Sequence, residues 1–124
     1  MNIITLLNAA QVFTQVAQMK ISSKLAYKIM KFCKSVDVEE EFYNNKRIDI
    51  INTYAEKDDN GQPIINDNGS IRIVQDKLAE ANAAMNELNG MDVEKPNIKF
   101  ALSELEELQL SVADMYLLDE FIEE

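Results

Sequence analysis

The sequence predicts an α+β fold in which a long helix packs with one or two shorter helices beside a small antiparallel sheet built on a β-hairpin. Three observations lead to this prediction. Apolar residues recur at helical spacing over much of the 124-residue chain. No Gly or Pro interrupts the chain between Ser22 and Glu56. Two Asn-Gly pairs, ending at Gly61 and Gly69, flank short β-branched runs, which is typical of a hairpin.

Helical spacing defines the first half of the chain. Residues 4–19 are predicted as a first helix that Thr5 can cap. A long helix should then run from Ser22 or Ser23 to about Glu56, with a potential break near residues 35–38. An unbroken helix of this length measures about 50 Å. It needs a partner helix, either within the chain, where residues 75–89 are favoured, or from a second copy.

The second half of the chain mixes turn signals with shorter apolar runs. Hairpin strands are predicted near residues 62–66 and 70–74, followed by a helix over 76–88 that Gly90 ends. An edge strand over 97–102 and a helix from Ser103 come next. Ser111 caps a last helix, whose apolar side consists of Val112, Met115, Leu118, Phe121 and Ile122. No internal repeat is expected. The length fits a single domain, 1–124.

Charge is distributed unevenly along the chain. The net charge is −10, yet residues 1–36 contain no Asp or Glu. Their five lysines are spaced by steps of four, four, three and three, which places them within about 120° of one helix face: Lys20, Lys24, Lys28, Lys31 and Lys34. This basic stripe is either a solvated face neutralised by acids elsewhere or a docking surface for a nucleic acid or an acidic protein. Direct nucleic-acid binding is not expected, because the rest of the chain repels phosphate.

The C-terminal segment has the opposite character. Its last 22 residues carry eight acids and no base. The candidate acidic face consists of Glu104, Glu106, Glu107, Asp114, Asp119 and Glu120. Such a face serves solubility, or it imitates the charge array of a nucleic acid and occupies a basic channel of another protein.

The sequence offers little for catalysis. It has no His and one cysteine, Cys33, so a Cys–His site within one chain is excluded. Cys33 is predicted to be a small buried apolar residue. The glycines are too far apart for a phosphate loop, and the loop from Glu56 to Asp67 fits a calcium loop poorly. We therefore expect no enzyme activity, cofactor, metal or small-molecule substrate. We also expect no membrane span, which places the protein in the cytoplasm.

One stretch of the chain resembles a known group of proteins. The segment from Ile50 to Pro63, which includes Tyr54, Lys57, Asp58 and Gly61, is followed by Asp67-Asn68-Gly69. Together with the acidic, Leu-rich C-terminus, this pattern resembles small uncharacterised phage and prophage proteins of Gram-positive bacteria. The resemblance covers residues 22–122 and supplies no catalytic residue. It implies a viral origin and a place in the host cytoplasm or the virion.

These observations lead to a functional expectation. The chain should be a non-enzymatic phage protein that binds a protein partner, either another protein or a second copy of itself, as a structural or assembly component. The alternative is an acidic inhibitor of a host nucleic-acid-binding defence complex, comparable to an anti-CRISPR protein that mimics nucleic acid.

Overall fold

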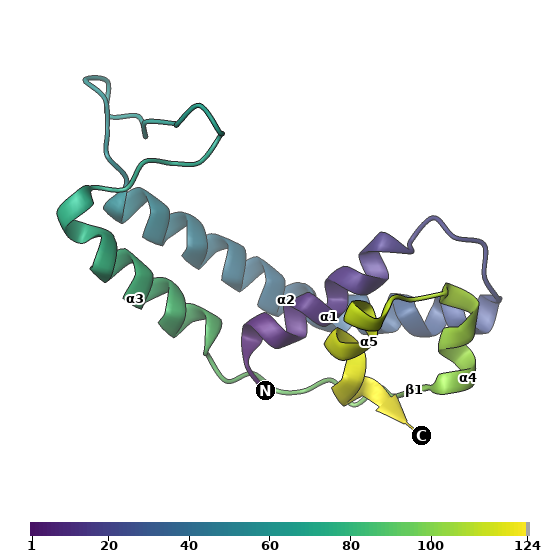
Figure 1. The fold of residues 1–124 in the computed structure, drawn as a ribbon. Helices are drawn as coiled ribbons and strands as arrows, with labels where there is room; N and C mark the ends of the chain where they lie inside the picture. The colour runs from purple at the N-terminus through teal and green to yellow at the C-terminus, as the bar shows by residue number, and fades with distance from the viewer. Residues whose placement is uncertain (124) are drawn as a thin grey trace.

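A computed structural model describes residues 1–123 and consists mainly of helices (Figure 1). The helices are α1 (Ile3–Gln15), α2 (Ser23–Tyr54), α3 (Leu78–Asn89), α4 (Leu102–Leu105) and α5 (Val112–Leu118). Single 3-10 turns span Gln75–Lys77, Glu106–Leu108 and Asp119–Phe121. Two short strands, β1 (Phe100–Ala101) and β2 (Ile122–Glu123), complete the described secondary structure.

Helix α2 confirms the prediction of one long helix. It runs unbroken for 32 residues, without the potential interruption near residues 35–38. Ser22 starts it, because its hydroxyl oxygen accepts the N–H of Leu25 at 3.3 Å. Only the first half of α2 carries buried residues: Leu25, Ile29, Phe32 and Val36. The two halves of this helix therefore belong to different parts of the molecule.

The first half of α2 lies in a head that contains the core. Helix α1 packs against α2 on one side and against α5 on the other. Four phenylalanines from four separate segments meet in the core: Phe13, Phe32, Phe100 and Phe121. Their ring centroids lie 4.8–6.0 Å apart, mostly edge to face, which is the arrangement that aromatic quadrupoles favour. Helix α1 ends at Gln15 rather than residue 19, and Asn2 rather than Thr5 precedes it.

The second half of α2 pairs with α3 to form an arm that projects from the head (Figure 1). Ala81 and Leu88 are the buried residues of α3. The Tyr43 hydroxyl donates a 2.7 Å hydrogen bond to the Asn89 side chain and joins the two helices near the head. The partner of the long helix is thus the intrachain helix that the sequence favoured. A 3-10 turn precedes α3, so the helix begins at Leu78, two residues later than predicted.

The predicted antiparallel, hairpin-based sheet is wrong. The sheet in the described residues is parallel and pairs Phe100 with Ile122 and Ala101 with Glu123. Helices α4 and α5 lie between the two strands in the chain and form the crossover that parallel strands require. The predicted strand over 97–102 shrinks to Phe100–Ala101, and α4 begins at Leu102.

The predicted hairpin segment instead forms a closed triangle, which we call the cap (residues 55–77). The N–H of Glu56 donates to the carbonyl of Arg72, that of Arg72 to Ile64, and that of Ile64 back to Glu56, at 2.8–2.9 Å. Successive corners are eight residues apart in the sequence. Pairing is confined to isolated antiparallel bridges, because the chain turns away after each corner. An Asp-Asn-Gly triplet recurs at the same eight-residue spacing, which corrects the expectation of no internal repeat.

Helix α5 begins as predicted. The Ser111 hydroxyl accepts the N–H of Asp114 at 3.1 Å, and the Asp114 carboxylate accepts the N–H of Ser111 at 3.3 Å. Its predicted apolar side needs one correction, because Val112 is 75% exposed whereas Leu118 is buried. Within residues 1–123, no helix has both the length and the apolar character needed to span a membrane.

Candidate interaction surfaces

The structure divides the basic stripe. Lys20 lies in the connection between α1 and α2, so the prediction that all five lysines share a helix face is wrong. Lys28 is half-buried, with its Nζ 2.9 Å from a Glu104 oxygen and 5.0 Å from the centre of the Phe100 ring. Lys24, Lys31 and Lys34 are exposed on α2. Three lysines of the predicted stripe therefore remain available on one helix face.

The acidic face is divided in a similar way. Glu104 accepts the N–H of Ala101 and an ammonium proton of Lys28, both at 2.9 Å. Glu107 accepts both the N–H and the hydroxyl of Ser22 at the start of α2, also at 2.9 Å. Asp114 caps its own helix. Half of the predicted acidic face therefore holds the fold together.

Glu104 is the member of this face with a perturbed acidity. The backbone hydrogen bond from Ala101, followed by the hydrogen bond from Lys28, lowers the pKa of its carboxyl group. Partial burial opposes this change, and the charges of Lys28 and Lys24 add to the lowering. Glu104 thus remains ionised and keeps its contacts.

The other three acidic residues, Glu106, Asp119 and Glu120, have exposed side chains. Within residues 1–123, neither these acids nor the three exposed lysines of α2 form an ion pair. The two charged segments are thus joined at Lys28 and Glu104, while each keeps unpaired charge at its surface.

Apolar residues interleave with the exposed lysines of α2, a feature that charge counting missed. Steps of three and four place five exposed residues on one face of the helix: Lys24, Tyr27, Lys31, Lys34 and Val38. We call this face the outer stripe. Tyr27 is 62% and Val38 75% exposed, and the Lys31 Nζ lies 5.8 Å from the centre of the Tyr27 ring. The spacing by three and four includes Tyr27 and Val38 as well as the lysines, so the sequence carries the signal for this face.

A second apolar surface lies on the opposite end of the chain. We call it the α5 patch, which comprises Leu102, Val112, Met115, Tyr116, Asp119 and Ile122 and encloses a shallow groove of about 250 Å³. Tyr116 is 78% and Val112 75% exposed, one helical turn apart. Asp119 supplies a carboxylate at the groove, and the exposed Glu120 follows it. This surface was missed in the sequence because Val112 was placed on the same apolar side of the last helix as Leu118 and Phe121.

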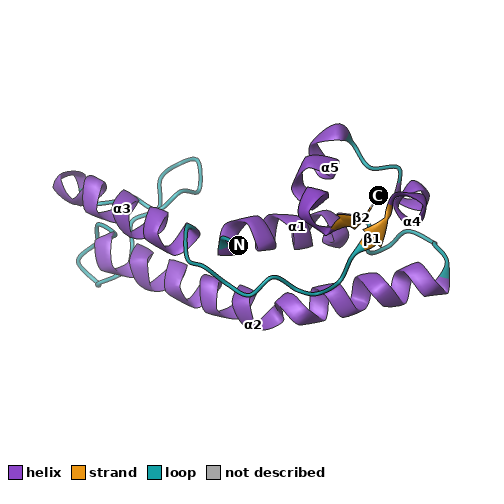
Figure 2. Cartoon of the chain, turned by 90° about the horizontal axis from the view of Figure 1, so that it is seen from below, coloured by secondary structure: helices purple, strands orange, loops and turns teal. Residues whose placement is uncertain are grey.

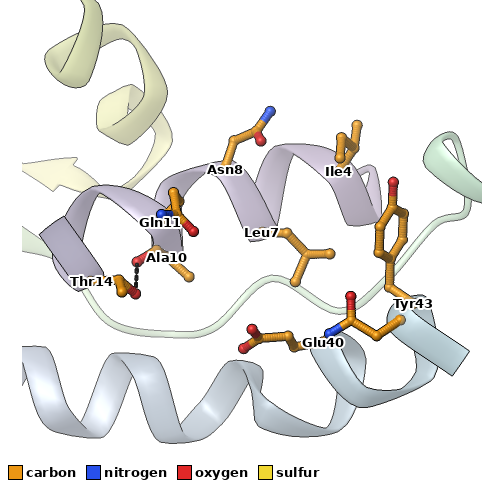
Figure 3. Close-up of a pocket in the computed structure, with 9 residues that line it drawn as sticks. Ile4, Leu7, Asn8, Ala10, Gln11, Thr14, Glu40 and Tyr43 are labelled. Atoms are coloured by element: carbon orange, nitrogen blue, oxygen red, sulfur yellow. Dashed lines mark hydrogen bonds between the residues drawn. The ribbon is translucent and has the colours of Figure 1, made fainter. Parts of the chain in front are cut away.

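The two grooves between α1 and α2 do not bring together side chains suited to catalysis or metal binding. The groove in Figure 3, about 210 Å³, places Asn8 and Gln11 of α1 above Glu40 and Tyr43 of α2. Glu40 is its one carboxylate, and no cationic side chain lines it. A neighbouring groove of about 300 Å³ is apolar and includes Cys33. No cluster of three or more His, Cys, Asp or Glu side chains suited to a metal occurs among residues 1–123.

Cys33 is half-buried rather than buried. Burial raises the pKa of its thiol, and the nearby charges of Asp37 and Glu40 raise it further. The thiol is therefore protonated at neutral pH, which is the less nucleophilic form.

Comparison with protein families, with curated proteins and with solved structures finds no match to this chain.

Proposed function

We propose that this chain is a non-enzymatic, phage-encoded protein that binds a protein partner as a structural or assembly component. The observation that carries the proposal is the α5 patch. It exposes an aromatic and a β-branched side chain, Tyr116 and Val112, beside a groove with an acidic residue at its edge.

The chemistry of the α5 patch favours a protein over other ligands. Tyrosine is enriched where binding energy concentrates in protein interfaces, because it buries a large apolar ring and keeps a hydroxyl for a hydrogen bond. Contiguous exposed apolar side chains on a small protein commonly mark such interfaces. A shallow groove is a poor site for a small molecule, which requires concave enclosure.

The arm gives additional support. The second half of α2 has no fully buried residue, although it is a continuous helix. A two-helix arm with a small cap at its end presents a long surface for its size (Figure 1). Extended surfaces of this kind suit proteins that connect other subunits better than they suit enzymes, which enclose their substrates.

Site-specific crosslinking tests the proposal. A photo-crosslinking phenylalanine analogue at position 116 should form a covalent adduct with one defined protein in infected cells or purified particles. The same analogue at position 62, in the exposed cap residue Gln62, is the matched control. The proposal requires adducts from position 116 that are absent or much weaker from position 62. Equal adducts from both positions, or none from 116, would contradict it.

The acidic inhibitor remains a second candidate because Glu106, Asp119 and Glu120 are exposed and unpaired within the described residues. Its support is weaker, since Glu104, Glu107 and Asp114 already bind groups of their own chain. A mimic of nucleic acid needs a long array of free charges. Lysine substitutions at Glu106, Asp119 and Glu120 should abolish binding to a nuclease complex, and binding that survives them would contradict this second candidate.

A further inference from the structure

We propose that the α5 patch of one copy binds the outer stripe of a second copy, so that the chain assembles head to tail. The inference rests on the proposed function and names its partner. The two surfaces are separate parts of the same chain. The outer stripe carries lysines, whereas the α5 patch carries an acidic residue.

Charge provides the first argument. The outer stripe carries three lysines that form no ion pair in the described residues, and residues 1–36 contain no acid. The α5 patch carries Asp119, belongs to a C-terminal segment with eight acids and no base, and is followed by Glu120. Opposite potentials steer two such surfaces together and disfavour pairing of either surface with itself.

Apolar matching provides the second argument. Tyr27 and Val38 interrupt the lysines on the outer stripe, while Val112 and Tyr116 stand beside the acids of the α5 patch. Contact between the two surfaces covers these four side chains at once. The stripe from Lys24 to Val38 is about 21 Å long at 1.5 Å per residue, which is sufficient for a helix-sized contact. A nucleic acid would match the lysines alone and would be repelled by the −10 net charge.

Position provides the third argument. Helix α1 contacts both α2 and α5 and lies between them, as Figure 2 shows. The outer stripe is on the face of α2 opposite to its buried residues Leu25, Ile29 and Phe32. The outer stripe and the α5 patch of one chain therefore cannot contact each other. Contacts between unlike surfaces of identical chains propagate into open assemblies or close into rings, unlike a two-fold dimer.

Two variants with one damaged surface each test the inference. Variant A carries Lys24→Glu, Lys31→Glu and Lys34→Glu, and keeps Lys28 because Lys28 binds Glu104. Variant B carries Val112→Arg and Tyr116→Arg at two of the most exposed apolar positions. A third variant with Lys46→Glu, Lys57→Glu and Lys77→Glu makes the same charge change outside both surfaces. Thermal melts verify that each variant is folded.

Sedimentation velocity should distinguish these proteins. The mass of the wild type should rise with concentration from the 14.1 kDa of one chain and exceed a dimer. Variants A and B should each stay monomeric, with apparent dissociation constants raised at least about tenfold. An equimolar mixture should stop at a heterodimer, since A keeps the α5 patch and B keeps the outer stripe. The third variant should associate like the wild type.

Other results would overturn the inference in distinct ways. A wild type that stays monomeric at high concentration excludes self-association, while adducts from position 116 to a different protein would leave the proposed function standing. Association that variants A and B do not impair would place the contact elsewhere. A monomer that binds duplex DNA at low salt through the lysines that variant A removes would identify a nucleic acid as the occupant of the outer stripe.

Discussion

At Glu104 the basic and acidic segments of the chain meet. Its carboxylate accepts the N–H of Ala101 and a proton of the Lys28 ammonium, and both contacts lower the pKa of the group. A carboxyl group whose pKa is lower in the folded state stabilises the fold above its unfolded pKa. This stabilisation is lost as the pH falls through the folded pKa.

We therefore expect a pH-dependent effect of Glu104→Gln. The variant should unfold at a lower urea concentration than the wild type at pH 7, because it loses the ionised contacts. The difference should shrink as the pH falls below the ordinary value of 4.5. Glu106→Gln, at an exposed acid two residues away, is the control and should leave the urea midpoint unchanged at every pH. A difference for Glu104→Gln that persists at low pH would contradict the role of its charge.

Single residues were predicted with mixed success, for physical reasons. Helical spacing placed Leu118 and Phe121 on the apolar side of the last helix, and both are buried in the core. The same spacing misplaced Val112, since a short helix at the surface can bury either of two faces. The pairing of Lys28 with Glu104 joins residues 76 apart, and spacing along the chain carries no signal for such a contact.

The cap is the segment whose structure follows most directly from the conformations of its own residues. Gly61 and Gly69 have φ angles of 77° and 86°, in the region where residues with a side chain pay a steric cost. Each glycine closes a turn in which its N–H donates to the carbonyl of Asp58 or Asn66. The two turns were predicted from their Asn-Gly pairs. The closure into a triangle was not, because it depends on where α2 ends relative to Glu56.

Replacing Gly69 tests this account of the cap. Gly69→Ala should destabilise the cap by about 1–2 kcal/mol, because a Cβ is unfavourable at positive φ. No atom lies within 4 Å of the position that this Cβ would take, so the cost is conformational rather than steric crowding by neighbours.

Hydrogen exchange provides the measurement for Gly69→Ala. The amides of Glu56, Ile64 and Arg72 should exchange faster, while the amides of the head keep their protection. Asp67→Ala changes the same turn at a position whose φ is not positive, so its effect on exchange should be small. Unchanged protection in Gly69→Ala would mean that the triangle does not depend on this turn.

At the scale of the whole molecule, uneven charge governs association. The basic outer stripe and the α5 patch lie in one head, with α1 between α2 and α5 (Figure 2). If copies assemble head to tail, exposed lysines and carboxylates supply much of the attraction. Raising sodium chloride from about 50 mM to about 500 mM shortens the screening length to roughly 4 Å. The average mass in light scattering should then fall toward 14.1 kDa.

A mass that does not change with salt would show that charge contributes little to the contact. The Val112→Arg and Tyr116→Arg variant is the useful comparison, because it removes the apolar part of the same surface. Its mass should be near that of one chain at both salt concentrations.

The overall architecture was predicted in part. The helical spacing of apolar residues predicts both α2 and α3. Their connection within one chain favours the pairing of these two helices with each other. The parallel sheet was missed because β1 and β2 are two residues long and 22 residues apart in sequence. Strands this short carry no alternation pattern. Their pairing is decided by the crossover through α4 and α5, which places Phe121 and Phe100 in the same core.

The unbroken course of α2 fixes the rotational phase between the head and the cap. A single helix carries residues from the core at Phe32 to the arm at Tyr54, with no hinge between them. One residue inserted near Asp37 would turn everything beyond it by about 100° and advance it by about 1.5 Å. Seven inserted residues would nearly restore the original orientation. The number of residues in α2 between the head and the cap therefore sets the direction in which the cap points.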